Sequence, residues 1–155
     1  MTIDKNDLEQ FIVAAKAACY VGDGASAAPS REGSHDLGYE DGEWRYLDSY
    51  FGGTDFLGQE VVWHRGTPVW AMNYYGYILR EDMIDASRAG NVIKVALASM
   101  YQEKRFLGGF EIPVGEYTYA DGNTGDVRSF QGVETITLDS EIVYRLDYHG
   151  GLVKP

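Results

Sequence analysis

Apolar residues near the N-terminus recur at the spacing of an amphipathic α-helix. The positions that share one face are Leu8, Phe11, Ile12, Ala15 and Cys19. The run Asn6-Asp7-Leu8-Glu9 has the form of a capping box, and Gly22 can supply a left-handed residue after the last turn. The pattern therefore predicts a helix over residues 6–20.

A second helical pattern covers residues 81–103. Its apolar face carries Ile93, Ala96, Leu97 and Met100. Gly90-Asn91 lies inside this segment, and glycine weakens a helix interior. The sequence therefore leaves open whether this segment is one helix or two.

The segments between and after these helices alternate apolar and polar residues as strands do. The predicted strands cover residues 44–50, 57–64, 68–75 with a tail to 79, 116–120, 130–138, and 142–149 with a tail at 152–153. Arg65-Gly66-Thr67 and Asp139-Ser140 are expected to form hairpin turns. Residues 22–42 predict a long loop with a short extended piece near 36–39, and Gly108-Gly109 with Pro113 indicates another loop.

The two groups of strands have matching sequences. An offset of 74 aligns residues 56–79 with 130–153 without a gap, so that WAMNYYG matches YRLDYHG. Upstream, residues 44–48 match 117–121, and an offset of 81 aligns the two helices. We therefore predict an internal duplication within a single domain of residues 1–155, with repeats of about 6–80 and 81–155. The predicted fold class is α+β: two tandem helix–β-meander repeats that form a mainly antiparallel sheet with packed helices.

Two long runs also resemble a known family. They are YFGGTDFLGQEVVWHRGTPVWAMNYYG and FQGVETITLDSEIVYRLDYHGG, within a resemblance that extends from about residue 8 to residue 153. The family consists of uncharacterised bacterial domains of unknown function, found alone or C-terminal to a repressor-type helix-turn-helix domain. The resemblance implies no particular activity, but a domain fused to regulators has a plausible role in sensing a ligand.

Charge and composition narrow the classes of partner. The net charge is −11, from 13 basic and 24 acidic residues, which disfavours direct binding to nucleic acid. It suits a cationic or hydrogen-bond-donating ligand, a basic protein partner, or solubility alone. No apolar run is long enough to span a membrane, and the N-terminus lacks the pattern of a signal peptide, so we expect a cytoplasmic protein. Cys19, the only cysteine, is expected to be a small buried hydrophobe.

Glu60 and Glu134 are the principal candidates for chemistry. Each lies in the apolar stripe of its strand, two residues after a glycine that allows a close approach to the backbone. A buried carboxylate requires a partner, and it tends to have a raised pKa that suits cation binding or acid–base catalysis. The structural alternative is that each glutamate only bonds backbone groups or an arginine such as Arg45, Arg128 or Arg145.

Alternation along the last strand of each repeat separates two faces. Trp70, Met72 and Tyr74 share one face, as do Tyr144, Leu146 and Tyr148, and we assign that face to the core. The opposite face is expected to meet solvent or to line a cleft. The predicted ligand-binding residues, drawn from both faces, are Glu60, Trp70, Asn73, Tyr75, Glu134, Tyr144, Asp147 and His149. No metal-binding spacing and no cofactor motif occurs, so we expect neither a metal nor a cofactor.

Three functions are compatible with these features. The leading hypothesis is a non-enzymatic, small-molecule-binding sensor or regulatory domain with an aromatic, acidic pocket. The second is an enzyme that uses Glu60 or Glu134 as general acid or base, with Asp147 and His149 nearby. The third is an acidic module that binds a basic protein, and exposed strand edges leave a homodimer open.

Overall fold

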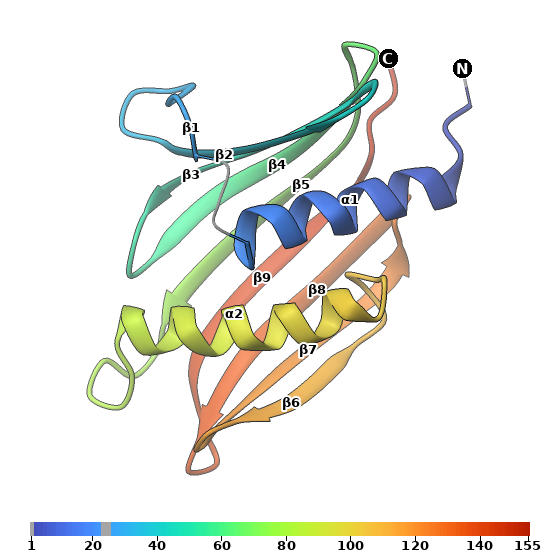
Figure 1. Ribbon diagram of the computed structural model, residues 1–155. Helices are drawn as coiled ribbons and strands as arrows, with labels where there is room; N and C mark the ends of the chain where they lie inside the picture. The colour runs from blue at the N-terminus through green and yellow to red at the C-terminus, as the bar shows by residue number, and fades with distance from the viewer. Residues whose placement is uncertain (1, 23–25) are drawn as a thin grey trace.

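A computed structural model describes residues 2–22 and 26–155. It contains one antiparallel sheet of nine strands in the order β1-β2-β3-β4-β5-β9-β8-β7-β6. Helices α1 (Lys5–Tyr20) and α2 (Ala86–Gln102) both lie on one face of this twisted sheet (Figure 1). The strands are β1 (Ser26–Ala27), β2 (His35–Asp41), β3 (Trp44–Gly52), β4 (Phe56–His64), β5 (Thr67–Ile78), β6 (Phe110–Val114), β7 (Tyr117–Asp126), β8 (Ser129–Leu138) and β9 (Glu141–Leu152). The predicted α+β class, with an antiparallel sheet and each helix followed by strands, is confirmed.

Both predicted helices are present, but their details differ. α2 continues through Gly90-Asn91, because burial of Ala89, Val92 and Ala96 on one face outweighs the roughly 1 kcal/mol that glycine costs. The N-cap of α1 is Asp4, whose side chain accepts from the backbone N–H groups of Asn6 and Asp7 at 2.8 and 3.1 Å. The predicted capping box at Asn6 is therefore wrong, as is the left-handed conformation of Gly22.

Two predicted loops contain strands. Within the predicted loop over residues 22–42, His35–Asp41 form β2, which pairs along its whole length with β3. Residues 23–25 of that loop lie outside the described part of the chain. Phe110–Val114 form β6 despite Pro113, which is tolerated because β6 is an edge strand. Both strands form because a neighbour supplies hydrogen bonds, and neither sequence shows clean alternation.

The centre of the sheet is the pairing of β5 with β9. Tyr74 lies opposite Tyr148, and the register is symmetric about this pair, with Trp70 opposite Leu152 and Ile78 opposite Tyr144. Residues related by the offset of 74 therefore occupy equivalent places on either side of the centre. This register is what a duplication would produce, and the duplication itself stays a prediction. We call residues 6–80 and 81–155 the first and second halves.

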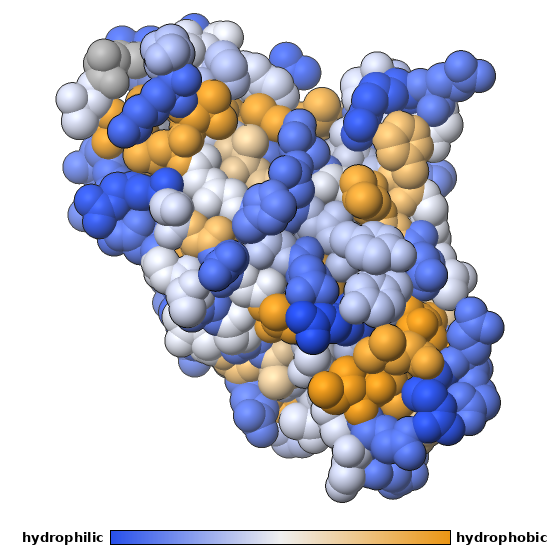
Figure 2. All heavy atoms as spheres, turned by 180° about the vertical axis from the view of Figure 1, so that it is seen from behind, coloured by the Kyte–Doolittle hydropathy of each residue, from blue (hydrophilic) through white to orange (hydrophobic). Residues whose placement is uncertain are grey.

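The core lies between the helices and the sheet. Trp70, Met72, Tyr144, Leu146 and Tyr148 are buried on the helix-covered face, as the alternation predicted. The opposite face of the sheet presents a mixture of polar and apolar side chains (Figure 2). Cys19 is buried, as predicted.

Among the described residues, no helix has the length and apolar character needed to cross a membrane.

Candidate functional site

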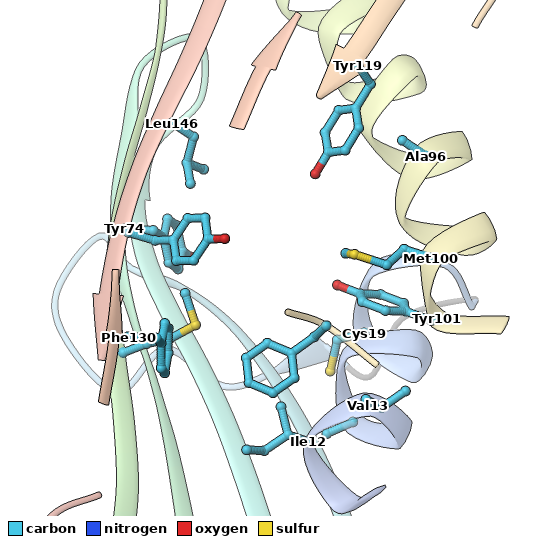
Figure 3. Packing of buried hydrophobic residues seen from close by; sticks show 14 of the residues in the cluster. Ile12, Val13, Cys19, Tyr74, Ala96, Met100, Tyr101, Tyr119, Phe130 and Leu146 are labelled. Atoms are coloured by element: carbon cyan, nitrogen blue, oxygen red, sulfur yellow. The ribbon is translucent and has the colours of Figure 1, made fainter. Parts of the chain in front are cut away.

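A cavity of about 400 Å³ lies between the helices and the sheet. This volume falls within the range of about 300–1,000 Å³ that small-molecule sites occupy. Both helices and the central strands of both halves contribute to its wall. The hydroxyl group of Tyr74 points from the strands toward α2, that of Tyr101 points from α2 toward the strands, and that of Tyr119 points into the space between them (Figure 3). The space is therefore enclosed by residues from the whole chain.

Four carboxylates face this cavity, two from each half: Asp48, Glu60, Asp121 and Glu134. Within each half the two acids are direct neighbours on adjacent strands, Asp48 opposite Glu60 and Asp121 opposite Glu134. Like charges directly opposite each other destabilise a sheet, so each pair requires compensation.

Tyrosines supply hydrogen bonds to all four carboxylates. In the first half, Tyr46 donates to Glu60 Oε1, and Tyr74 and Tyr20 each donate to Asp48 at 2.6 Å. The second half repeats part of this arrangement. Tyr119 donates to Glu134 Oε1, and Tyr148 donates to Asp121 Oδ1 at 2.6 Å.

The glycine two residues before each glutamate makes room for one of these tyrosines. A Cβ atom at Gly58 would collide with the hydroxyl of Tyr74, and a Cβ atom at Gly132 would collide with that of Tyr148. The close approach that the sequence indicated is therefore made by a tyrosine ring that crosses the strand to reach Asp48 or Asp121.

Within the described part of the chain, only the first half adds a buried cation. Lys16 Nζ, from α1, lies 2.7 and 3.0 Å from the two carboxylate oxygens of Glu60, and both side chains are almost fully buried. The sequence analysis missed Lys16. Lys16 could have been identified from its position, because it lies four residues after Ile12 and three before Cys19, within the apolar stripe of the helix.

The predicted arginine partners of the two glutamates are wrong. Arg128 pairs with Asp126, and Arg145 pairs with Asp147, each two residues away in the sequence. Arg45 lies over the ring of Trp63. Arg45 and Arg145 adjoin the buried Tyr46 and Tyr144, so strand alternation directs both arginines to the opposite face of the sheet. Arg128 lies in the turn between β7 and β8. Tyrosines and Lys16 are the partners instead.

The environment of the cavity shifts the titration of three acids. Burial, followed by the negative charge of Glu60, raises the pKa of Asp48 to about 7. Burial, followed by the charge of Asp121, raises the pKa of Glu134 to about 7. Burial also raises the pKa of Asp121, against the hydrogen bond from Tyr148. Near neutral pH, Asp48 and Glu134 are therefore each partly protonated.

The predicted ligand-binding residues divide into three groups. Glu60, Glu134 and Tyr144 all line the cavity, and the hydroxyl of the buried Tyr144 has no hydrogen-bond partner. Trp70 is fully buried outside the cavity wall, where its Nε1 donates to the carbonyl of Val127 at 3.0 Å.

The remaining four predicted residues are Asn73, Tyr75, Asp147 and His149. They line a hollow on the opposite face of the sheet, where Asn73 Nδ2 lies 3.2 Å from His149 Nε2. The expectation that Asp147 and His149 lie near the glutamates is therefore wrong, because successive residues of a strand point to opposite faces.

The sequence analysis also missed Asp48 and Asp121 as site residues. They align with each other in the repeat, two residues after Tyr46 and Tyr119, and that repetition of an acid beside a tyrosine was the available signal. No group of three or more side chains suited to hold a metal ion occurs in the described part of the chain.

Comparison with known proteins gives one match. The sequence profile of a family described as a domain of unknown function (DUF5680) matches residues 48–153. No curated protein and no solved structure matches the chain.

Proposed function

The chain belongs to the DUF5680 family, a domain of unknown function, and from its cavity we propose that it is a non-enzymatic sensor domain for a small organic cation. One observation carries the proposal. A single aromatic-lined cavity presents four carboxylates and, among the described residues, one buried lysine. That lysine is already engaged by Glu60. The cavity therefore has negative charge available for a ligand.

The wall also suits an organic cation rather than a hydrated metal ion. Rings of Tyr50, Phe56, Tyr101 and Phe106 lie beside the carboxylates, and aromatic faces attract cations through the ring quadrupole. A net charge of −11 further concentrates cations around the molecule. A bound ligand would contact both helices and the sheet, so binding would tighten the helices against the strands, and this is the change a regulatory domain can report.

The affinity for a cation should increase with pH. Because the pKa values of Asp48 and Glu134 lie at about 7, these groups become negatively charged as the pH rises through neutrality. A permanently charged ligand should bind more tightly at about pH 8 than at about pH 6, and its binding should release protons near neutral pH. A calorimetric titration in buffers of different ionisation enthalpy measures that release.

A thermal-shift screen at about pH 8 tests the proposal. The panel holds primary amines, quaternary ammonium ions and guanidinium compounds, each matched with an alcohol and a carboxylate of the same size. A ligand that binds only the folded protein raises the melting temperature. We expect that rise with members of the cationic set and not with their matched partners. The proposal fails if no cation raises the melting temperature, or if the alcohols and carboxylates raise it equally.

The raised pKa of Glu134 also favours a second candidate, an enzyme with Glu134 as general acid or base. Asp147 and His149 take no part in this candidate, because they lie on the other face of the sheet. The two candidates differ in turnover. Only the enzyme converts a bound compound into a product, whose spectral signal grows with time. Glu134→Gln should abolish that conversion while the fold persists.

A further inference from the structure

The two halves of the cavity have equivalent carboxylates but unequal compensation. Glu60 and Glu134 are related by the offset of 74, and each accepts from the equivalent tyrosine, Tyr46 or Tyr119. Asp48 and Asp121 likewise each accept from Tyr74 or Tyr148. The difference between the halves lies in the helices.

In the first half, Lys16 forms a complete ammonium site. Its Nζ contacts both oxygens of Glu60, lies 3.6 Å from the sulfur of Met72, and sits 5.3 Å from the centre of the Phe106 ring. A carboxylate, a thioether and a ring face together replace the water that the ammonium group loses on burial.

In the second half, the position equivalent to Lys16 is Leu97. The offset of 81 that relates α1 to α2 places Tyr101 at the position of Tyr20 and Leu97 at that of Lys16. The two helices also occupy corresponding places in the fold, since α1 packs on β2 and β3 while α2 packs on β6 and β7. Leu97 lines the cavity as Lys16 does, but it brings no charge.

No cation within the described residues forms an ion pair with Glu134 or Asp121. Lys16 is bound to Glu60, and Arg105 bonds Glu103 and two backbone carbonyls. Lys94, the other lysine of the cavity wall, is exposed.

Unused acceptors remain in this half of the cavity. Tyr119 and Tyr148 each occupy one oxygen of their carboxylate, and no hydrogen bond among the described residues reaches Glu134 Oε2 or Asp121 Oδ2. Glu134 and Asp121 both line the cavity. A ligand that supplies hydrogen bonds would satisfy these buried acceptors.

We propose that the second half takes its missing cation from the ligand, a primary alkylammonium group that binds at Glu134 and Asp121 with its carbon chain against Leu97. This inference rests on the proposed function and specifies the class of ligand and its seat. The N–H donors of a primary ammonium can bond both unused carboxylate oxygens. A quaternary ammonium ion has no donor and would leave them unpaired. Lys16 is the internal template for the bound state.

The substitution Leu97→Lys tests this inference, because it would supply the second half with its own ammonium group. The probe is n-hexylammonium, with 1-hexanol and hexyltrimethylammonium as matched compounds. Val95→Lys is the control, since it adds the same charge on the exposed side of the same helix. Melting temperature and isothermal titration at about pH 8 are the readouts.

We expect n-hexylammonium, and neither matched compound, to raise the melting temperature of the wild type and of Val95→Lys. In Leu97→Lys, the affinity for n-hexylammonium should fall at least about tenfold, and the unliganded protein should melt higher than Val95→Lys. If Leu97→Lys does not fold, Glu134→Gln should show the same loss of affinity.

Two outcomes separate this inference from the proposed function. The inference is overturned, and the proposed function stands, if the wild type responds to other cations but binds n-hexylammonium no better than hexyltrimethylammonium. The same holds if n-hexylammonium binds Leu97→Lys or Glu134→Gln as tightly as it binds the wild type. If no cation of any class stabilises the wild type, the proposed function fails and takes the inference with it.

Discussion

At the residue scale, the dominant feature is a set of acids held next to one another by tyrosines. The hydroxyl groups satisfy lone pairs of the carboxylates, but they do not neutralise them. Burial therefore still disfavours the charged form, so Asp48 and Glu134 take up a proton near pH 7, which removes the cost of a buried charge. Glu60 also forms a direct ion pair with Lys16.

This arrangement makes the stability of the protein depend on pH. The pKa of Glu134 rises from its ordinary value of 4.5 to about 7 on folding. The stabilising contribution of the neutral carboxyl is thus complete below about pH 4 and is lost as the pH rises through about 7. Glu134→Gln stays neutral, so at about pH 8 it should unfold with a free energy on the order of 3 kcal/mol higher than the wild type. At about pH 4 the two proteins should be similar.

Urea unfolding at both pH values measures this difference. The control is Glu116→Gln, which removes the same charge from an exposed position and should leave the pH dependence intact. If Glu134→Gln and the wild type lose stability in parallel between the two pH values, the acid in the cavity is not the source of the effect.

At the scale of elements, α1 is attached to the sheet by a charge as well as by apolar packing. The buried ion pair between Lys16 and Glu60 links α1 to β4. Breaking a buried pair from one side leaves an uncompensated charge, which typically costs about 3–5 kcal/mol. α2 has no equivalent pair, so its position on the sheet depends more on packing and, by our inference, on the ligand.

Lys16→Met should therefore lower the free energy of unfolding by about 3–5 kcal/mol, whereas Lys16→Met with Glu60→Gln should recover much of that loss. Lys5→Met is the matched control on the same helix, because Lys5 forms only exposed ion pairs and should change stability by less than about 1 kcal/mol. Chemical denaturation of the four proteins gives the comparison. A double variant no more stable than Lys16→Met would argue against the pair as the cause.

At the scale of the whole molecule, the two halves share one core and one cavity. Trp70 of the first half packs against Phe106 and Phe130 of the second, and its Nε1 donates to the carbonyl of Val127. The pairing of β5 with β9 joins the strands of the two halves into one sheet. Separation would expose a long strand edge and the apolar wall of the cavity on each half.

Fragments 1–80 and 81–155 should therefore show no cooperative unfolding when each is alone. When mixed, they should regain a cooperative transition, and the tryptophan fluorescence of fragment 1–80, which holds all three tryptophans, should shift to the blue as the Trp70 ring becomes buried. Thermal melts followed by tryptophan emission measure both properties. A half that melts cooperatively as a monomer would show that the shared core is not required.

Local pattern in the sequence was sufficient for much of the fold. The helices, six of the strands and the faces of β5 and β9 followed from periodicity, because the side chains of one element are placed by its own geometry. Glu60 and Glu134 stood out as acids in apolar stripes for the same reason. The symmetric register at the centre of the sheet matches the repeat offsets, although the sequence predicted no pairing of these two strands.

Only the tertiary structure decided which of these residues meet. β2 and β6 are strands because a neighbouring strand supplies their hydrogen bonds, and their own composition does not indicate it. Lys16 and Glu60 are 44 residues apart, and Asp48 is joined to Tyr74 across an intervening strand. Such contacts depend on how the elements pack. The sequence by itself indicated that Glu60 and Glu134 would face the core. The packing of two helices on one sheet brought Asp48 and Asp121 into the same cavity and, within the described residues, placed a buried cation in only one half.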